Sequence, residues 1–130
     1  MALLLTAALL AAACRPDAST ARGTAERFLD AHYVHIDLPA ALEFTTGVAR
    51  HKVESELALV QGQAIDETTR KPSVHYTLLE ERPESEQAVS YVYRGTISVE
   101  DADRFDRRWL LTVRFEDGGW HVTNYQEIDG

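Results

Sequence analysis

Residues 105–128 read FDRRWLLTVRFEDGGWHVTNYQEI, and this stretch predicts a β-hairpin. In its first half every second residue is apolar, so these side chains point to one face of an extended strand: Trp109, Leu111, Val113 and Phe115. The Asp117-Gly118 step supplies the positive φ angles that a tight hairpin turn requires. A turn centred there places Phe115 opposite Trp120, and it places Val113 opposite Val122. Aromatic and β-branched pairs of this kind stabilise antiparallel strands.

Two earlier stretches also alternate with a period of two, at residues 74–79 and 89–99, and predict two more strands. Turns are expected between the strands at residues 83–85 and 101–104. Successive strands joined by short turns pair antiparallel. The second half of the chain therefore predicts a meander of at least four strands.

The register of this meander can be derived from burial. Placing Tyr91 opposite both Tyr76 and Val113 keeps the apolar side chains of neighbouring strands on one shared face. The same register sets Gly95 opposite Trp109, whose indole can cover the bare backbone of a strand glycine. Because the strands are long and twisted, the sheet is expected to be curved.

The first half of the chain has a helical period instead. Thr24 is expected to cap a first helix, and Asp37 is expected to end it and to cap a second helix that runs to Gly47. A third apolar stripe, which closes at Gly62, predicts a third helix. The residues that form the buried face of the first helix are Ala25, Phe28, Leu29, His32, Tyr33 and Ile36.

The sequence therefore predicts a single α+β domain at residues 24–129, with N-terminal helices packed on one face of a curved antiparallel sheet of four or more strands. The net charge is −8 and the Lys and Arg residues are scattered, which argues against a nucleic-acid partner because phosphate binding needs concentrated positive charge. The single Cys cannot form an internal disulfide, so packing alone is expected to hold the fold.

Residues 1–13 (MALLLTAALLAAA) are too short to span a bilayer as a mature helix and fit a signal peptide. The stretch from Leu10 to Cys14 resembles the lipobox of bacterial lipoproteins, in which cleavage leaves the Cys as an acylated N-terminus. The resemblance implies that Cys14 carries the lipid, palmitate included, and that residues 14–23 are a tether. The domain would then be anchored to a membrane of the bacterial cell envelope, on its periplasmic or outer-surface side.

Three alternatives for this N-terminus remain open. Ala11-x-Ala13 also suits ordinary secretory cleavage, which would leave a secreted protein. The run could stay uncleaved as an anchor. It could also form an apolar helix that docks on its own domain.

The C-terminal strand carries the pattern W-x-V-x-N-[YF]-x-E as Trp120, Val122, Asn124, Tyr125 and Glu127. Two further stretches accompany it, HID at residues 35–37 and ALEFTTG at residues 41–47. Together these resemble the nuclear transport factor 2-like superfamily over residues 20–128. The resemblance implies a cone-shaped, cystatin-like fold in which a bent sheet wraps the helices around a pocket. By the same resemblance, small bacterial lipoproteins of this shape with no assigned reaction are common. The superfamily hosts enzymes, binding modules and docking proteins, so the fold alone does not decide the function.

Several aromatic and polar side chains are candidates for a ligand pocket on the helix-covered face of the sheet. Aromatic walls with a few polar tips are typical of small-molecule sites, although large aromatics also simply fill cores. His32 could bind a polar ligand group or act as a base, or it could be a neutral core histidine hydrogen-bonded to a Tyr or a carbonyl. The pocket candidates are His32, Tyr33, Tyr76, Tyr91, Tyr93, Trp109 and Asn124.

Enzymes of this fold, such as ketosteroid isomerases and polyketide cyclases, use a pocket Asp, often with a Tyr or His. None of the inward strand positions in the predicted register is acidic. Asp30 is expected on the outer face of the first helix and Asp37 is expected to be used in capping. We therefore assign no catalytic residue.

Metal and cofactor sites are not predicted either. His32 and His35 lie about 60° apart around a helix, so with Asp37 they do not converge as tetrahedral ligands must. The segment at residues 101–103 lacks the length and the Gly of a calcium loop. Phosphate-binding glycine loops and nucleotide fingerprints are absent from the sequence, and no cofactor is expected.

Three functional hypotheses follow. The first is a non-enzymatic envelope lipoprotein domain that binds a small apolar ligand or docks on an envelope partner. The second is an isomerase- or cyclase-type enzyme that uses His32 or a pocket tyrosine. The third is a structural module that forms a homodimer through the outer face of the sheet, at Leu110, Thr112, Thr123 and Tyr125.

Overall fold

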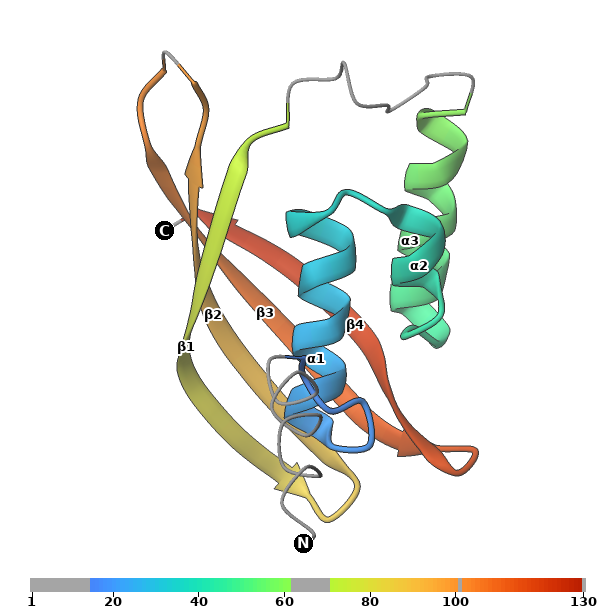
Figure 1. Cartoon of the computed structure of the whole chain (residues 1–130). Coiled ribbons are helices and arrows are strands. Elements are labelled where there is room, and N and C mark those ends of the chain that lie inside the picture. Colours follow the sequence, from blue (N-terminus) through green and yellow to red (C-terminus); the bar gives the residue numbers. More distant parts are fainter. Residues whose placement is uncertain (1–14, 62–70, 101, 130) are drawn as a thin grey trace, which may run out of the picture.

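The computed structural model describes residues 15–61, 71–100 and 102–129. It has the predicted α+β architecture: the helices cover the concave face of a four-stranded antiparallel sheet of order β1-β2-β3-β4 (Figure 1). Among the described residues, no helix is both long and apolar enough to cross a membrane. The elements are α1 (Ala21–Leu29), the π-helical turn η1 (Asp30–Val34), α2 (Leu38–Leu42), α3 (Gly47–Leu59), β1 (Ser73–Ser85), β2 (Ala88–Ser98), β3 (Phe105–Glu116) and β4 (Gly119–Asp129).

Helix α1 begins earlier than predicted. Its N-cap is Thr20, whose hydroxyl oxygen accepts the N–H of Gly23 at 2.9 Å, and not Thr24. Thr24 is buried inside the helix, and its hydroxyl donates to the Thr20 carbonyl at 2.8 Å. Gly23 packs closely on the preceding turn, because a Cβ there would lie 1.6 Å from the carbonyl oxygen of Asp17. The folded unit therefore includes residues before 24.

The end of the first helical segment is a wide turn. In η1 the N–H of His35 donates to the Asp30 carbonyl at 2.8 Å, and the N–H of Asp37 then donates to the Ala31 carbonyl at 2.7 Å. Ile36 between them is left-handed, with φ 51°, a conformation that is rare for a β-branched residue. Asp37 caps α2 as predicted, since its side chain accepts the N–H of Ala40 at 3.1 Å. Helix α2 stops at Leu42, short of the predicted end at Gly47.

The C-terminal hairpin matches the prediction from sequence. Asp117 and Gly118 form its turn, with φ 51° and 81°. Phe115 pairs with Trp120 and Val113 pairs with Val122. The rings of Phe115 and Trp120 meet edge to face, with centroids 5.4 Å apart.

The predicted register between the other strands is wrong. Tyr91 pairs with Leu111 on β3 and with Glu81 on β1, not with Val113 and Tyr76. The shift on β3 is two residues, so the inward face of that strand is unchanged. The β1–β2 turn lies at residues 86–87 and not at 83–85, and Pro83 lies within β1, which is an edge strand.

Trp109 covers Gly95 as expected, but from a diagonal position. Trp109 pairs with Tyr93, and Gly95 pairs with Arg107. A Cβ on Gly95 would lie 2.2 Å from the indole ring, so only glycine leaves room for it.

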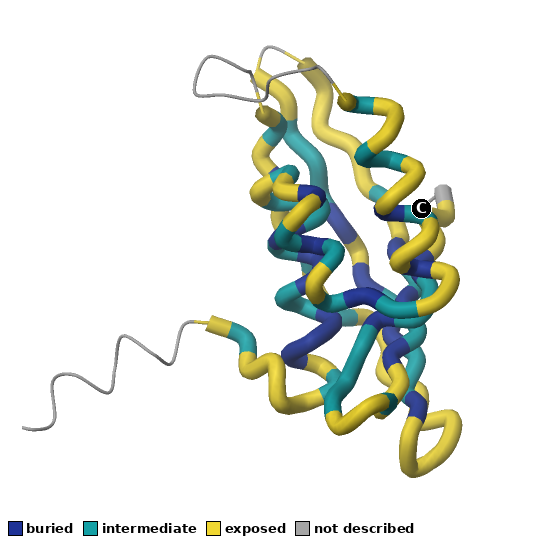
Figure 2. The backbone as a smooth tube through the Cα atoms, turned by 90° about the vertical axis from the view of Figure 1, so that its right-hand side faces the viewer, coloured by how far each residue is buried: buried dark blue, intermediate teal, exposed yellow. Residues whose placement is uncertain are grey.

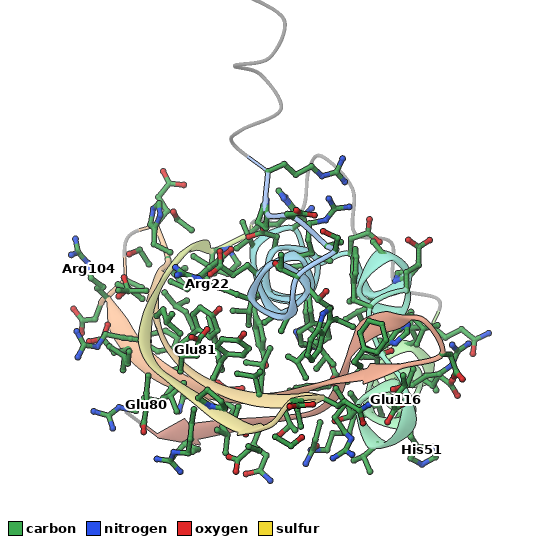
Figure 3. All side chains as sticks on the ribbon, turned by 90° about the horizontal axis from the view of Figure 1, so that it is seen from below. Arg22, His51, Glu80, Glu81, Arg104 and Glu116 are labelled. Atoms are coloured by element: carbon green, nitrogen blue, oxygen red, sulfur yellow. The ribbon has the colours of Figure 1, made fainter. Side chains whose placement is uncertain are left out.

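Two irregularities in the sheet change which side chains face the helices. Between Leu78 and Glu80 the register of β1 shifts by one residue, and Glu81 comes to the inner side of the curve, opposite Tyr91. Figure 3 shows Glu80 on the outer side of β1 and Glu81 on the inner side. In β4 the shift leaves Thr123 without a partner residue on β3, so the alternation of the following residues is inverted. Tyr125 is consequently buried against the helices, not on the predicted outer face.

The segment before α3 is joined to the edge strand β4. The N–H of Thr46 donates to the Val122 carbonyl at 3.0 Å, and the N–H of Val122 donates to the Phe44 carbonyl at 2.8 Å. Thr45 thus forms an isolated parallel bridge to Val122. This contact fixes α3 along β4.

The core lies between the helices and the concave face of the sheet, and the exposed residues lie in the turns, along most of β1 and on one side of α3 (Figure 2). The predicted aromatic interior is filled: Tyr91, Tyr93 and Trp109 are at most 2% exposed. All buried residues of the described chain lie between Gly23 and Tyr125, and a chain that starts at Arg15 contains every described helix and strand.

Candidate functional site

A hollow of about 510 Å³ opens at the mouth of the cone, between η1, α3 and β4. We call it the mouth hollow. It combines aromatic rings with charged side chains, and two of the predicted pocket residues, His32 and Tyr33, contribute to its wall. It is lined by His32, Tyr33, Lys52, Glu56, Tyr125, Gln126 and Glu127.

Glu56 on α3 is the centre of the polar wall. Its Oε2 accepts a hydrogen bond from Nε2 of His32 at 2.7 Å, and its Oε1 accepts a short hydrogen bond from the hydroxyl of Tyr125. The three residues come from three elements and are brought together only by the tertiary fold. One carboxylate therefore fixes the orientation of both a ring nitrogen and a phenol.

His32 is held as a neutral imidazole. Burial lowers its pKa below the usual value, and this effect outweighs the neighbouring Glu56 carboxylate, which acts in the opposite direction. A carboxylate only accepts hydrogen bonds, so Nε2 carries the hydrogen and Nδ1 carries the lone pair. Nδ1 is buried and has no hydrogen-bond partner among the described residues. His32 is therefore neither a purely satisfied core histidine nor a freely accessible base.

Aromatic rings surround this histidine. Tyr33 lies 4.2 Å from His32, centroid to centroid, and stacks on Trp109 at 4.1 Å with an interplanar angle of 14°. Phe28 lies 5.3 Å from His32 and 4.9 Å from Tyr125 on the other side. Burial raises the pKa of both Tyr33 and Tyr125 far above the usual tyrosine value, so both hydroxyls keep their hydrogens.

Lys52 closes the mouth hollow along the edge of β4. Its ammonium donates to the Tyr125 carbonyl at 2.7 Å and to Oδ1 of Asn124 at 2.9 Å. It also lies 5.3 Å from the centroid of the Tyr125 ring. Asn124, a predicted pocket residue, therefore orients Lys52 at the sheet edge. The inverted alternation in β4 explains this, since it exchanges the faces of Asn124 and Tyr125.

Two other predicted pocket residues, Tyr76 and Tyr93, lie on the opposite flank, where β1 and β2 face α1 and η1. Tyr91 pairs with Glu81 on the same flank, and Trp109 on β3 stacks on Tyr33. The hydroxyl of Tyr76 donates to Asp30 at 2.6 Å, and the hydroxyl of Tyr93 donates to Glu26 at 3.1 Å. Glu26 also pairs with Arg22 at 2.8 Å. Figure 3 shows Arg22 and Glu81 on the inner side of the curve formed by β1.

The concave side thus holds carboxylates that the strand pattern does not indicate. Asp30 was predicted on the outer face of the first helix, but the sheet curls around the flank of the helix and brings Tyr76 to it. Glu26 and Glu56 likewise project from helix flanks toward tyrosines. A usable signal was present: a buried tyrosine hydroxyl needs a hydrogen-bond partner, so inward tyrosines indicate polar groups on the facing helices.

The mouth hollow is smaller than one other hollow. A hollow of about 830 Å³ lies between the turn after η1 and the end of α3, with Ile36, Leu57 and Val60 in its wall. Gln61 and Lys71 also line it, and these flank residues 62–70, which lie outside the described part of the chain. We assign no site to it.

The remaining expectations from the sequence concern metal binding and the lipid anchor. Within residues 15–61, 71–100 and 102–129, no three His, Cys, Asp or Glu side chains come together as metal ligands would. Cys14, the predicted lipidation site, lies outside the described residues, as do the residues of the predicted signal peptide.

No family model and no curated protein matches the chain. Several solved structures, however, are similar to the chain in fold. A ketosteroid isomerase-like protein from Erwinia carotovora atroseptica SCRI1043 is 16% identical with a TM-score of 0.60, and the match covers 85% of this chain and 93% of that one. An NTF-2 like protein of unknown function from Shewanella oneidensis MR-1 is 18% identical with a TM-score of 0.61, over 82% of this chain and 93% of that one.

A third structure is a domain of unknown function with a cystatin-like fold from Nostoc punctiforme PCC 73102. It is 10% identical with a TM-score of 0.62, over 92% of this chain and 76% of that one. Identities of this size establish the fold and carry no activity. The chain has the cone-shaped α+β fold of the nuclear transport factor 2-like proteins.

Proposed function

We propose that this chain is a lipid-anchored bacterial envelope protein whose single domain binds a small molecule in the mouth hollow without transforming it. The observation that carries the proposal is the wall built by His32, Glu56 and Tyr125. These side chains come from three elements and are already held in place by hydrogen bonds, so little order has to be gained when a ligand binds.

The mouth, not the interior, is the place for the ligand. Tyr91, Tyr93 and Trp109 are packed against one another and against the helices, and their burial leaves the interior occupied. The mouth hollow offers the half-buried Tyr33 for contact with an apolar body, and it has charged groups at its rim. A small molecule with one flat apolar part and one polar end fits this wall.

Binding without chemistry is favoured because the candidate bases are occupied or shielded. Glu56 already accepts two hydrogen bonds, and Nε2 of His32 donates to it. The free lone pair of Nδ1 is buried. A general base must reach the proton that it removes, and the buried Nδ1 of His32 does not do so in this arrangement.

The binding experiment compares native and denaturing mass spectra of the chain that starts at Arg15, after purification from a bacterial host. We expect a small molecule that is released only on denaturation. Added ligand should also raise the melting temperature, because ligand at 100 times its dissociation constant adds about 2.7 kcal/mol to the free energy of unfolding. Tyr33→Ala should lose this gain, and Thr96→Ala, on the outer face of β2, should keep it.

An empty spectrum, together with no stabilisation by a library of small aromatic and aliphatic compounds, would contradict the binding function. The library is needed because a weak ligand is lost during purification.

The anchor is tested separately. We expect labelled palmitate to be incorporated into the full chain and the protein to sediment with membranes. Cys14→Ser should abolish both, because no other thiol is present in the sequence. A chain that is released in soluble form with Cys14 intact would instead support the secreted alternative.

One observation favours the enzymatic alternative. Glu56 places a carboxylate beside His32 at an open hollow, which is the arrangement of a base with an orienting acid. If the domain is an isomerase or cyclase, His32→Ala should abolish turnover of the bound molecule and leave its binding largely intact. Recovery of the bound molecule unchanged after long incubation would exclude this alternative for that ligand.

A further inference from the structure

We infer that the molecule bound in the mouth hollow is a small organic cation, a protonated amine with an apolar body. The inference rests on the proposed function, because it names the ligand class of the same site. Three features of the hollow lead to it: the carboxylates at its rim, the ring faces of its wall, and the way in which it already holds one ammonium group.

Two carboxylates line the hollow from opposite elements. Glu56 projects from α3 and Glu127 from β4, and their side chains are 36% and 47% exposed, so both are accessible to a ligand. Each oxygen of Glu56 accepts one hydrogen bond and keeps a second acceptor position. Burial is the main cause of the raised pKa of Tyr33, and the same two carboxylates raise it further, so their field extends over the wall between them.

Positive charge is present, but it is already in use. The ammonium of Lys52 donates two hydrogen bonds to the edge of β4, and Arg107 pairs with Glu127 at 3.3 Å. His32 adds no charge, because it is neutral. The remaining hydrogen-bonding capacity of Glu56 is that of an acceptor, which suits a ligand that donates.

The wall already stabilises one primary ammonium group. The Nζ of Lys52 lies above the Tyr125 ring and is bonded to two oxygens. Tyr33 offers a second electron-rich ring in the same hollow. The net charge of −8 adds a long-range attraction for cations. A ligand ammonium at the Glu56–Glu127 rim would repeat the arrangement that Lys52 shows.

The test uses three probes of one shape and different charge: benzylammonium, benzyl alcohol and benzoate. They are titrated at pH 7 and 0.15 M salt into the isotope-labelled chain that starts at Arg15, which contains every described helix and strand. Two-dimensional NMR follows the backbone signals of Tyr33, Glu56 and Tyr125. We expect benzylammonium to shift these signals at the lowest concentration.

Three variants test whether the charge at the rim of the hollow controls the affinity for benzylammonium. Glu127→Gln should weaken benzylammonium binding about two- to fivefold, the size expected for an exposed charge pair. Lys52→Met removes the competing cation at the rim and should strengthen benzylammonium binding by a similar factor. Glu54→Gln makes the same charge change on α3 outside the hollow, where salt screens it, and should have no effect.

Tighter binding of benzoate or benzyl alcohol than of benzylammonium, with shifts at the same three residues, would overturn the cation inference and leave the binding function standing. Weaker benzylammonium binding in Lys52→Met, with an unchanged melting temperature, would overturn it as well. No shift at these residues with any probe would also overturn it, and the binding function would then be decided by the mass-spectrometric and library experiment.

Discussion

The two flanks of the concave face use the same chemical pair, a tyrosine hydroxyl donated to a carboxylate, with different results. On the α1–β1 flank Tyr93 donates to Glu26 and is completely buried. On the α3–β4 flank Tyr125 donates to Glu56, which also holds His32 and lines the mouth hollow. The first pair satisfies a polar group inside a core, and the second lies in the wall of an open hollow. Accessibility, not the identity of the side chains, separates the two roles.

The largest expected effect comes from the filled region. Trp109→Ala should lower the free energy of unfolding by about 3–5 kcal/mol, because it leaves a cavity between Gly95 and Tyr33. Phe115→Ala on the same strand is the control, since Phe115 is half exposed at the end of the sheet, and it should cost about 1 kcal/mol or less. Urea unfolding followed by fluorescence or circular dichroism measures both. Equal losses would show that the interior is not packed as described.

The second prediction compares the two hydroxyls. Tyr93→Phe and Tyr125→Phe should each lower the free energy of unfolding by about 1.5–3 kcal/mol, because each removes a hydrogen bond to a charged group. Only Tyr125→Phe should shift the imidazole NMR signals of His32, since only Tyr125 is joined to it through Glu56. A shift of the His32 signals in Tyr93→Phe would contradict the separation of the two flanks.

The third and smallest effect is the pH dependence contributed by His32. Its pKa is lower in the folded chain than the unfolded value of about 6.5, so between these two values the unfolded chain binds more protons. The contribution of His32 to stability is therefore complete above pH 6.5 and is lost as the pH falls toward the folded pKa, by up to about 1.4 kcal/mol per pH unit.

The measurement is the free energy of unfolding between pH 5 and 7.5 for the wild type and for His32→Gln. Subtracting the two curves removes the contributions of other groups, and the difference should decline below pH 6.5. His51→Gln, at an exposed position on α3, should leave the wild-type profile unchanged. A difference curve that is flat, or that rises as the pH falls, would contradict the buried neutral state of His32.

The fold class could be derived from the sequence because the hairpin turn, the helix cap and the change of period are each encoded by residues close together in the chain. Asp117-Gly118 fixes one hairpin through its backbone preference, and the predicted pairs next to its turn, Phe115–Trp120 and Val113–Val122, are correct. The helix-capping role of Asp37 is equally local. The order of helices and strands follows from a change of period in the sequence.

The register and the site could not be derived in the same way. The register shifts near Leu79 and Thr123 are not marked by any characteristic residue type in the sequence. Each of them nevertheless inverts the faces of the residues that follow. This is why Tyr125 was predicted outside and Asn124 inside. The contact of His32 with Glu56 joins residues 24 positions apart on two helices, and only the packing of α3 against β4 brings it about.

The contacts of residues 44–46 and of Lys52 with β4 also have a consequence for association. β4 is an edge of the sheet, and edge strands offer unpaired backbone groups to other chains. Here the N–H and the carbonyl of Val122 are bonded to residues 44 and 46, and the carbonyl of Tyr125 is bonded to Lys52. A second strand cannot add along this part of β4 without displacing its own covering segment. Growth into an extended, aggregated sheet is therefore hindered along residues 122–125 of this edge by contacts within the same chain.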